Sequence, residues 1–152
     1  MYSHMDELFQ IINKISDLTF VQCDSSESIV SKKILKEADL VVVNLPQNPA
    51  NFLQILKSNE FQSDNLVFLI GQYNEDSKYH FNNIRRKFHI QKENIGVIPY
   101  NVDFMDSLIG GKTIEFLERN RDCRKQDYNY YFMQELRTST NMILKKVGFD
   151  VS

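Results

Sequence analysis

The sequence has little of several residue types that mark particular protein classes. Its 152 residues include no Trp and only two cysteines, Cys23 and Cys123, which are too few and too far apart for a disulfide framework or a zinc site. The 18 basic side chains are balanced by 20 acidic ones, so no positive excess favours nucleic acid or an anionic membrane. No apolar run approaches the ~18 residues that span a bilayer, and the first residues lack the pattern of a secretory signal. We therefore expect a reduced, cytoplasmic protein.

Three short apolar runs do not alternate with polar residues, at residues 40–45, 66–70 and 95–98. Such runs are typical of strands that are buried on both faces of a parallel sheet. A fourth, weaker run covers residues 18–23. Segments with helical spacing lie between the runs, and one of them follows Asn48-Pro49, a pair that suits a helix cap and a first helical position. The pattern predicts an α/β fold of three layers, with a mainly parallel sheet of about four strands and flanking helices.

Both ends of the chain are predicted to be helical. An amphipathic helix is expected within residues 1–17, and a long helix covers about residues 126–147. Residues 18–101 form the predicted βα core, and residues 102–152 form a helical C-terminal part. Because no Pro/Gly/Ser-rich linker, repeat or low-complexity tract interrupts the chain, we expect all 152 residues to form a single domain.

Polar residues follow each predicted strand, where ligands bind in open parallel sheets. Most of them are amides, hydroxyls and tyrosines, and Asp24 is the one early carboxylate. A carboxylate there could order water around Mg²⁺ beside nucleotide phosphates. The capping interpretation is preferred, however, since Glu27 follows Asp24 at the spacing of a helix-capping pair and no phosphate-binding loop accompanies them. Loops after strands also favour Asn, Asp and Ser for turns and caps, so a structural role is expected for most of these residues.

Four other features of the sequence could indicate functional sites. Gly110-Gly-Lys-Thr113 looks like the tail of a P-loop, but the glycine required five positions before Gly111 is Asp106, and the preceding segment has helical character. We therefore exclude a P-loop there. The basic run at residues 85–87 is predicted to be a solvated helix face. The aromatic cluster at residues 128–132 indicates either a partner surface or packing of the terminal helix across the sheet. No His or Cys residues have metal-ligand spacing.

The order of the segments at residues 37–44, 66–74, 96–101 and 104–112 resembles the C-terminal half of the ParA/MinD group. These proteins are deviant Walker-A P-loop ATPases, and the CpaE/TadZ-like branch is the most similar. The resemblance covers roughly residues 18–117. It implies a bacterial P-loop NTPase-like domain that functions in partitioning or polar localisation.

The resemblance also assigns six vestigial nucleotide-site positions: Asp24 at the end of the Walker B strand, Gln72 or Asn74 near the adenine-recognition position, and Pro99, Tyr100 and Asn101 beside the base. The family's P-loop belongs to an N-terminal half that this chain lacks. Phosphate binding supplies the catalytic machinery of such enzymes, so we expect no ATP hydrolysis, no catalytic residue and no metal site. ATP and Mg²⁺ are expected as cofactors only if the missing half is supplied.

In the family, the P-loop strand lies inside the sheet, so its loss exposes an apolar strand edge or sheet face. Native proteins cover or pair such edges. The N-terminal helix, the C-terminal helix or another subunit must then do so here. We therefore expect a non-catalytic domain that binds a protein partner or forms a homodimer.

Two alternatives remain open. One is a degenerate receiver-type signalling domain, in which Asn44 stands in place of the phosphoacceptor. A receiver also needs an acidic pair after its first strand, and residues 23–25 offer only one acid. The other is an ATP-binding protein whose phosphate site is completed by a second chain or by a missing N-terminal segment.

Overall fold

The computed structural model describes residues 2–23, 28–58 and 65–151, which fall into two compact units, Met1–Glu37 and Ala38–Ser152. The first unit contains helices α1 (Tyr2–Ile15) and α2 (Ile29–Glu37). Ser28 lies just before α2 and caps it, because its hydroxyl oxygen accepts the N–H of Ser31 at 2.9 Å. An ion pair of 2.5 Å between Lys33 and Asp6 joins the two helices. That the whole chain folds as a single domain stays a prediction.

The second unit is built on a parallel sheet of three strands, in the order β1 (Val41–Pro46), β2 (Leu66–Tyr73) and β3 (Ile95–Pro99). Val41 pairs with Leu66, and Phe68 pairs with Ile95. These strands confirm the predicted α/β class and the three strong apolar runs.

The predicted fourth strand at residues 18–23 is wrong, because the structure places no strand there. Phe20 is 79% exposed and Val21 is 47% exposed, so the segment buries neither side chain in a core. The segment belongs to the first unit, whose described residues include no other strand to pair with it. An extended segment with no ladder partner does not form a strand, whatever its β propensity. Cys23, predicted to lie inside that strand, is half-buried outside it.

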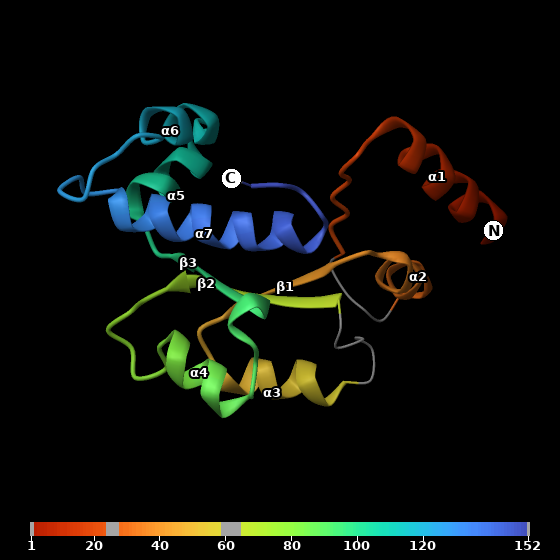
Figure 1. Cartoon of the computed structure of the whole chain (residues 1–152), viewed down its shortest axis with the longest axis horizontal. Coiled ribbons are helices and arrows are strands. Elements are labelled where there is room, and N and C mark those ends of the chain that lie inside the picture. Colours follow the sequence, from red (N-terminus) through yellow and green to blue (C-terminus); the bar gives the residue numbers. More distant parts are fainter. Residues whose placement is uncertain (1, 24–27, 59–64, 152) are drawn as a thin grey trace. The chain divides into compact units, whose positions relative to one another are not determined.

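Helices cover both faces of the sheet, as the three-layer prediction requires (Figure 1). One face carries α3 (Pro49–Lys57) and α4 (Phe81–Lys87), and a 3₁₀ helix, η2 (Lys92–Asn94), leads from α4 into β3. The other face carries α5 (Val102–Ile109), α6 (Thr113–Arg119) and the long α7 (Tyr130–Lys146). Asn48 caps α3 through a 3.0 Å bond from the N–H of Ala50, as its position before Pro49 predicts.

Aromatic side chains fill the core on each side of the sheet. On one side, the ring of Phe52 lies 5.4 Å from that of Phe68 and 5.7 Å from that of Phe88. On the other, Phe104 and Phe132 have ring centroids 4.7 Å apart. Both rings contact that of Phe116, which lies about one turn into α6. Within the described residues, none of the helices combines the length and apolar character that crossing a bilayer demands.

The strand β1 is buried on one face only, which corrects the prediction that every apolar run is covered on both sides. Val41 and Leu45 are each 8% exposed, whereas Val42 is 38% exposed and Asn44 is also exposed. Asn44 pairs with Leu69, which in turn pairs with Gly96, so this open face is the one that α7 covers further along the sheet. Because α7 packs along β3, it leaves the corresponding face of β1 open.

Candidate functional site

The carboxyl ends of the three strands meet at one edge of the sheet, where the resemblance assigns a nucleotide site. The side chain of Gln47, just after β1, holds the loop after β2 in place. Its amide nitrogen donates to the carbonyls of Asn74 (2.9 Å) and Tyr79 (3.1 Å), and its amide oxygen accepts the N–H of Asn74 (2.9 Å). The edge is therefore fixed by bonds within the chain.

Gln72 and Asn74 both lie at this edge and are exposed. Gln72 adopts a left-handed backbone conformation, with φ of 49°, at the irregularity in the pairing of β2 with β3. The side-chain oxygen of Asn74 accepts the N–H of Asp76 at 2.9 Å. Asn74 therefore acts as a turn residue, which is a common role of Asn after a strand.

Asn101 is buried, and both polar atoms of its side chain are engaged. Its oxygen accepts the N–H of Phe104 at 2.8 Å and so caps α5. Its nitrogen donates to the side-chain oxygen of Asn129 at 2.8 Å. Asn129 in turn donates to the side-chain oxygens of Asp103 and Asn120, both at 3.1 Å. The amide of Asn101 thus ties the start of α5 to the residue before α7.

The remaining assigned positions differ in accessibility. Pro99 is buried in the sheet and pairs with Tyr73. Tyr100 is 57% exposed, and its N–H donates to the carbonyl of Tyr73 at 3.0 Å. Asp24 lies outside the described residues. The structure thus gathers Gln72, Asn74, Pro99, Tyr100 and Asn101 at one edge of the sheet, and it engages two of their amide side chains in turns and caps.

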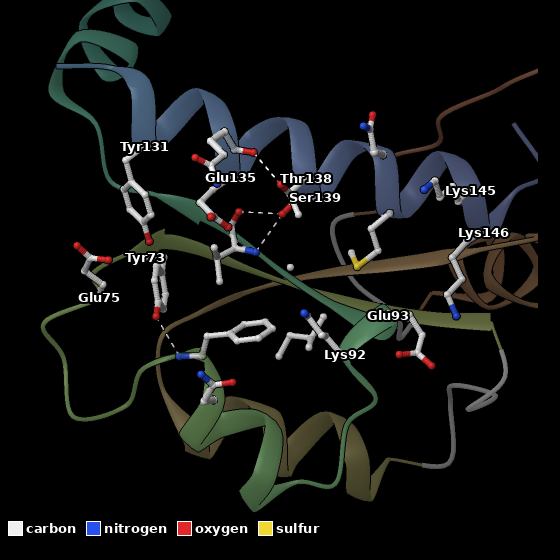
Figure 2. Close-up of a pocket in the computed structure, with 18 residues that line it drawn as sticks. Tyr73, Glu75, Lys92, Glu93, Tyr131, Glu135, Thr138, Ser139, Lys145 and Lys146 are labelled. Atoms are coloured by element: carbon white, nitrogen blue, oxygen red, sulfur yellow. Dashed lines mark hydrogen bonds between the residues drawn. The ribbon is translucent and has the colours of Figure 1, made fainter. Parts of the chain in front are cut away.

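An open groove of about 1040 Å³ begins beside this edge and runs along β3 (Figure 2). Its walls are α7 on one side and the start of α4 with η2 on the other. Its apolar part comes from the side chains of Phe81 and Met142 and from the β3 residues Ile95 and Val97. The described residues contain no group of three or more His, Cys, Asp or Glu that could hold a metal ion.

The edge of β3 is closed within the groove by one side chain of α7. The hydroxyl of Ser139 accepts the N–H of Val97 at 3.1 Å and donates to the carbonyl of the same residue at 2.9 Å. Ser139 is only 2% exposed. The helix comes this close because Gly96 has no side chain, and a Cβ there would lie 2.5 Å from the Ser139 oxygen. One serine therefore satisfies both backbone groups of Val97, in the middle of an edge strand.

The end of the groove nearest the strand ends is acidic and aromatic. Tyr73, Glu75, Tyr131 and Glu135 line it. Burial, followed by the charge of Glu75, raises the pKa of the Glu135 carboxyl. Burial and the carboxylates of Glu75 and Glu135 raise the pKa of the Tyr131 phenol. Tyr131 therefore stays protonated at neutral pH and serves as a hydrogen-bond donor.

The opposite end of the groove carries mainly positive charge. Lys145 and Lys146 lie in the last turn of α7, and Lys92 faces them from η2 together with one acidic residue, Glu93. The ammonium group of Lys146 donates to the side-chain oxygen of Asn94. The two ends thus have opposite charge, and apolar surface lies between them.

Sequence reasoning missed these groove residues. Glu75 lies in a loop, and Glu135 and Lys145 belong to the polar side of a helix whose apolar stripe was the visible signal. The aromatic cluster at residues 128–132 was the one hint. Phe132 lies in the core, whereas Tyr128 and Tyr131 are exposed, so only part of the cluster packs in the core. Comparisons with family models, with curated proteins and with solved structures give no match to this chain.

Proposed function

We propose that this chain is a non-catalytic domain of the ParA/MinD type that works by binding another protein. The observation that carries the proposal is the open face and edge of β1. Within the described residues of the second unit, Ala38–Ser152, β1 is an outer strand of the sheet, with Val42 and Asn44 exposed on one face. Yet residues 40–45 have the composition of a strand buried on both faces. An uncovered strand of this kind is a template for pairing with another chain.

The engaged amide side chains support binding of a protein rather than nucleotide chemistry. The resemblance places Asn101 and Asn74 near the base. In the structure, the side-chain oxygen of each accepts a hydrogen bond from a backbone N–H group. Gly110-Gly-Lys-Thr113 follows the helix α5 and not the strand that a P-loop requires, which supports the exclusion of a P-loop at this position. A role in partitioning or polar localisation is supported by the resemblance alone.

Thermal unfolding tests the proposal, with and without ATP·Mg²⁺ and at two protein concentrations. A nucleotide at ~100 times its dissociation constant would add about 2.7 kcal/mol and raise Tm by several degrees. We expect no shift with ATP·Mg²⁺. We expect Tm to rise with protein concentration if a second copy covers β1. A clear shift with ATP·Mg²⁺ would overturn the proposal in favour of a nucleotide-binding protein.

A pair of matched variants locates the binding surface. Val42→Lys places a charge on the open face of β1, which should abolish self-association because an ammonium group cannot be buried there without a partner. Leu53→Lys places the same charge on α3, where Leu53 is 45% exposed, and should leave association unchanged. Sedimentation velocity gives the oligomeric state of both. Association that survives Val42→Lys would contradict the role of β1.

A further inference from the structure

The groove along β3 differs from the open edge of β1, because strand pairing is hindered at the middle of β3. Ser139 occupies both the N–H and the carbonyl of Val97, and Pro99 has no N–H to offer. An incoming strand would have to break the two Ser139 bonds before it could pair with the middle of β3. Whatever occupies the groove must therefore be recognised by side chains.

The charged groups that are available for such recognition lie at the two ends. Neither Glu75 nor Glu135 forms an ion pair within the described part of the chain, and each repels the other. Figure 2 shows Glu75, Tyr131 and Glu135 toward one end of the groove and Lys145 and Lys146 toward the other, with Lys92 and Glu93 between them. A cation placed between the two carboxylates would offset their mutual repulsion and would be attracted by both of them.

The distance between the ends restricts the occupant. Glu135 and Lys145 are ten residues apart on α7, which corresponds to about 15 Å along a helix that rises 1.5 Å per residue. The charges of an amino acid or another small zwitterion are much closer together than that. An extended peptide advances about 3.3 Å per residue and alternates its side chains, so residues four positions apart cover most of the interval and lie on the same face. Its intervening side chains would then contact Phe81 and Met142.

We propose that the groove binds an extended segment of a partner protein, in which a Lys or Arg side chain lies between Glu75 and Glu135 and an acidic side chain four residues away reaches Lys145. The argument rests on the proposed function, since it identifies the segment of the protein partner that this domain recognises. Tyr131 lines the acidic end, where its ring can contact the cation. The apolar stretch between the two ends contributes through burial of the intervening side chains.

The test is an NMR titration of the ¹⁵N-labelled full chain with blocked hexapeptides. The probe is acetyl-Lys-Val-Ser-Val-Glu-Thr-amide, whose two charges are four residues apart and lie on the same face of an extended chain. One control peptide has the Lys and Glu adjacent, and another has Lys at both positions. We expect the probe to shift the amide resonances of Tyr131, Glu135, Lys145 and Val97, and to bind about fivefold more tightly than either control.

Matched variants assign the charges. The double variant Glu75→Gln with Glu135→Gln should lower the affinity for the probe about fivefold. The effect is modest because an ion pair at a partly exposed site contributes little to binding. Glu118→Gln removes an exposed carboxylate from α6 and should change nothing. The ¹⁵N spectrum of each variant also shows that it is folded.

Three results would overturn the inference: no shift at millimolar probe, shifts that map to β1, or equal binding by the control peptides. The sedimentation result for Val42→Lys separates the two proposals. If Val42→Lys abolishes association and the probe does not bind in the groove, the groove inference alone fails. If association is absent in the parent chain as well and no peptide binds, the proposed function fails too.

Discussion

The two edges of the sheet are treated differently by the same chain. At β3, the hydroxyl of Ser139 bonds both outward groups of Val97, and Gly96 lets α7 come close enough for these bonds. At β1, residues 41–46 include no charged side chain, and only Pro46, at the end of the strand, is a residue of the kind that discourages pairing. A single serine thus occupies the outward groups at the middle of β3, and the residues of β1 themselves include no comparable device.

The largest effect is expected at the close approach of α7 to β3. Gly96→Ala would place a Cβ 2.5 Å from the Ser139 oxygen, 3.0 Å from its Cβ and 3.1 Å from a methyl group of Leu69. We expect a loss of about 2–3 kcal/mol in the free energy of unfolding, because the helix must move off the strand. Urea denaturation measures it.

Gly110→Ala is the matched control for that variant, since its added Cβ would meet only the Asp106 carbonyl, at 3.2 Å, and its backbone is in the right-handed helical region. The cost there should stay below about 1 kcal/mol. Equal stability of the Gly96→Ala variant and the parent chain would show that α7 does not depend on this approach.

A smaller effect is expected from Ser139→Ala, which removes the protection of the β3 edge without adding bulk. The buried N–H and carbonyl of Val97 would lose their partner, at a cost of about 1–3 kcal/mol. The amide of Val97 should also exchange faster with solvent. Thr140→Ala on the same helix removes a hydroxyl that bonds only to the carbonyl of Leu136, and should cost less than about 0.5 kcal/mol. If the two variants are equally stable, Ser139 does not close the edge.

The smallest effect concerns the acidic end of the groove. Because the folded pKa of Glu135 is raised by burial and by Glu75, the folded state binds more protons than the unfolded state at pH values above the ordinary glutamate pKa. Stability therefore falls as pH rises through that window. Glu135→Gln removes the dependence, so we expect a small rise of Tm at pH 7 and none at pH 3.

The control for this pH dependence is Glu118→Gln, whose carboxylate is exposed on α6. It should follow the parent chain at both pH values. A fall of Tm at pH 7 for the Glu135→Gln variant would mean that the charge of Glu135 stabilises the fold, contrary to the account of the groove.

Local sequence signals predicted most of the fold. Apolar runs without alternation marked β1, β2 and β3, and Asn48 before Pro49 marked the start of α3. They failed at residues 18–23, because strand formation depends on a partner that the run itself does not specify. They also overstated the burial of β1, since the same composition says nothing about how far α7 extends across the sheet.

The site was less predictable than the fold. The preference of Asn for caps after strands anticipated the roles of Asn74 and Asn101. The groove was out of reach, because Glu75 and Glu135 meet only through the packing of α7 along β3. Polar residues on the outer side of a helix look solvated until a neighbouring element makes one wall of a groove beside them.

The most direct test of the account is hydrogen–deuterium exchange of the two edge strands at increasing protein concentration. The Val97 amide should exchange slowly at every concentration, because Ser139 covers it. The amides of β1 that do not bond to β2 should exchange fast in dilute solution and slowly once a second copy or another partner covers them. If these β1 amides were as protected as Val97 in the most dilute sample, β1 would already be covered, and the central claim that it awaits a partner would be contradicted.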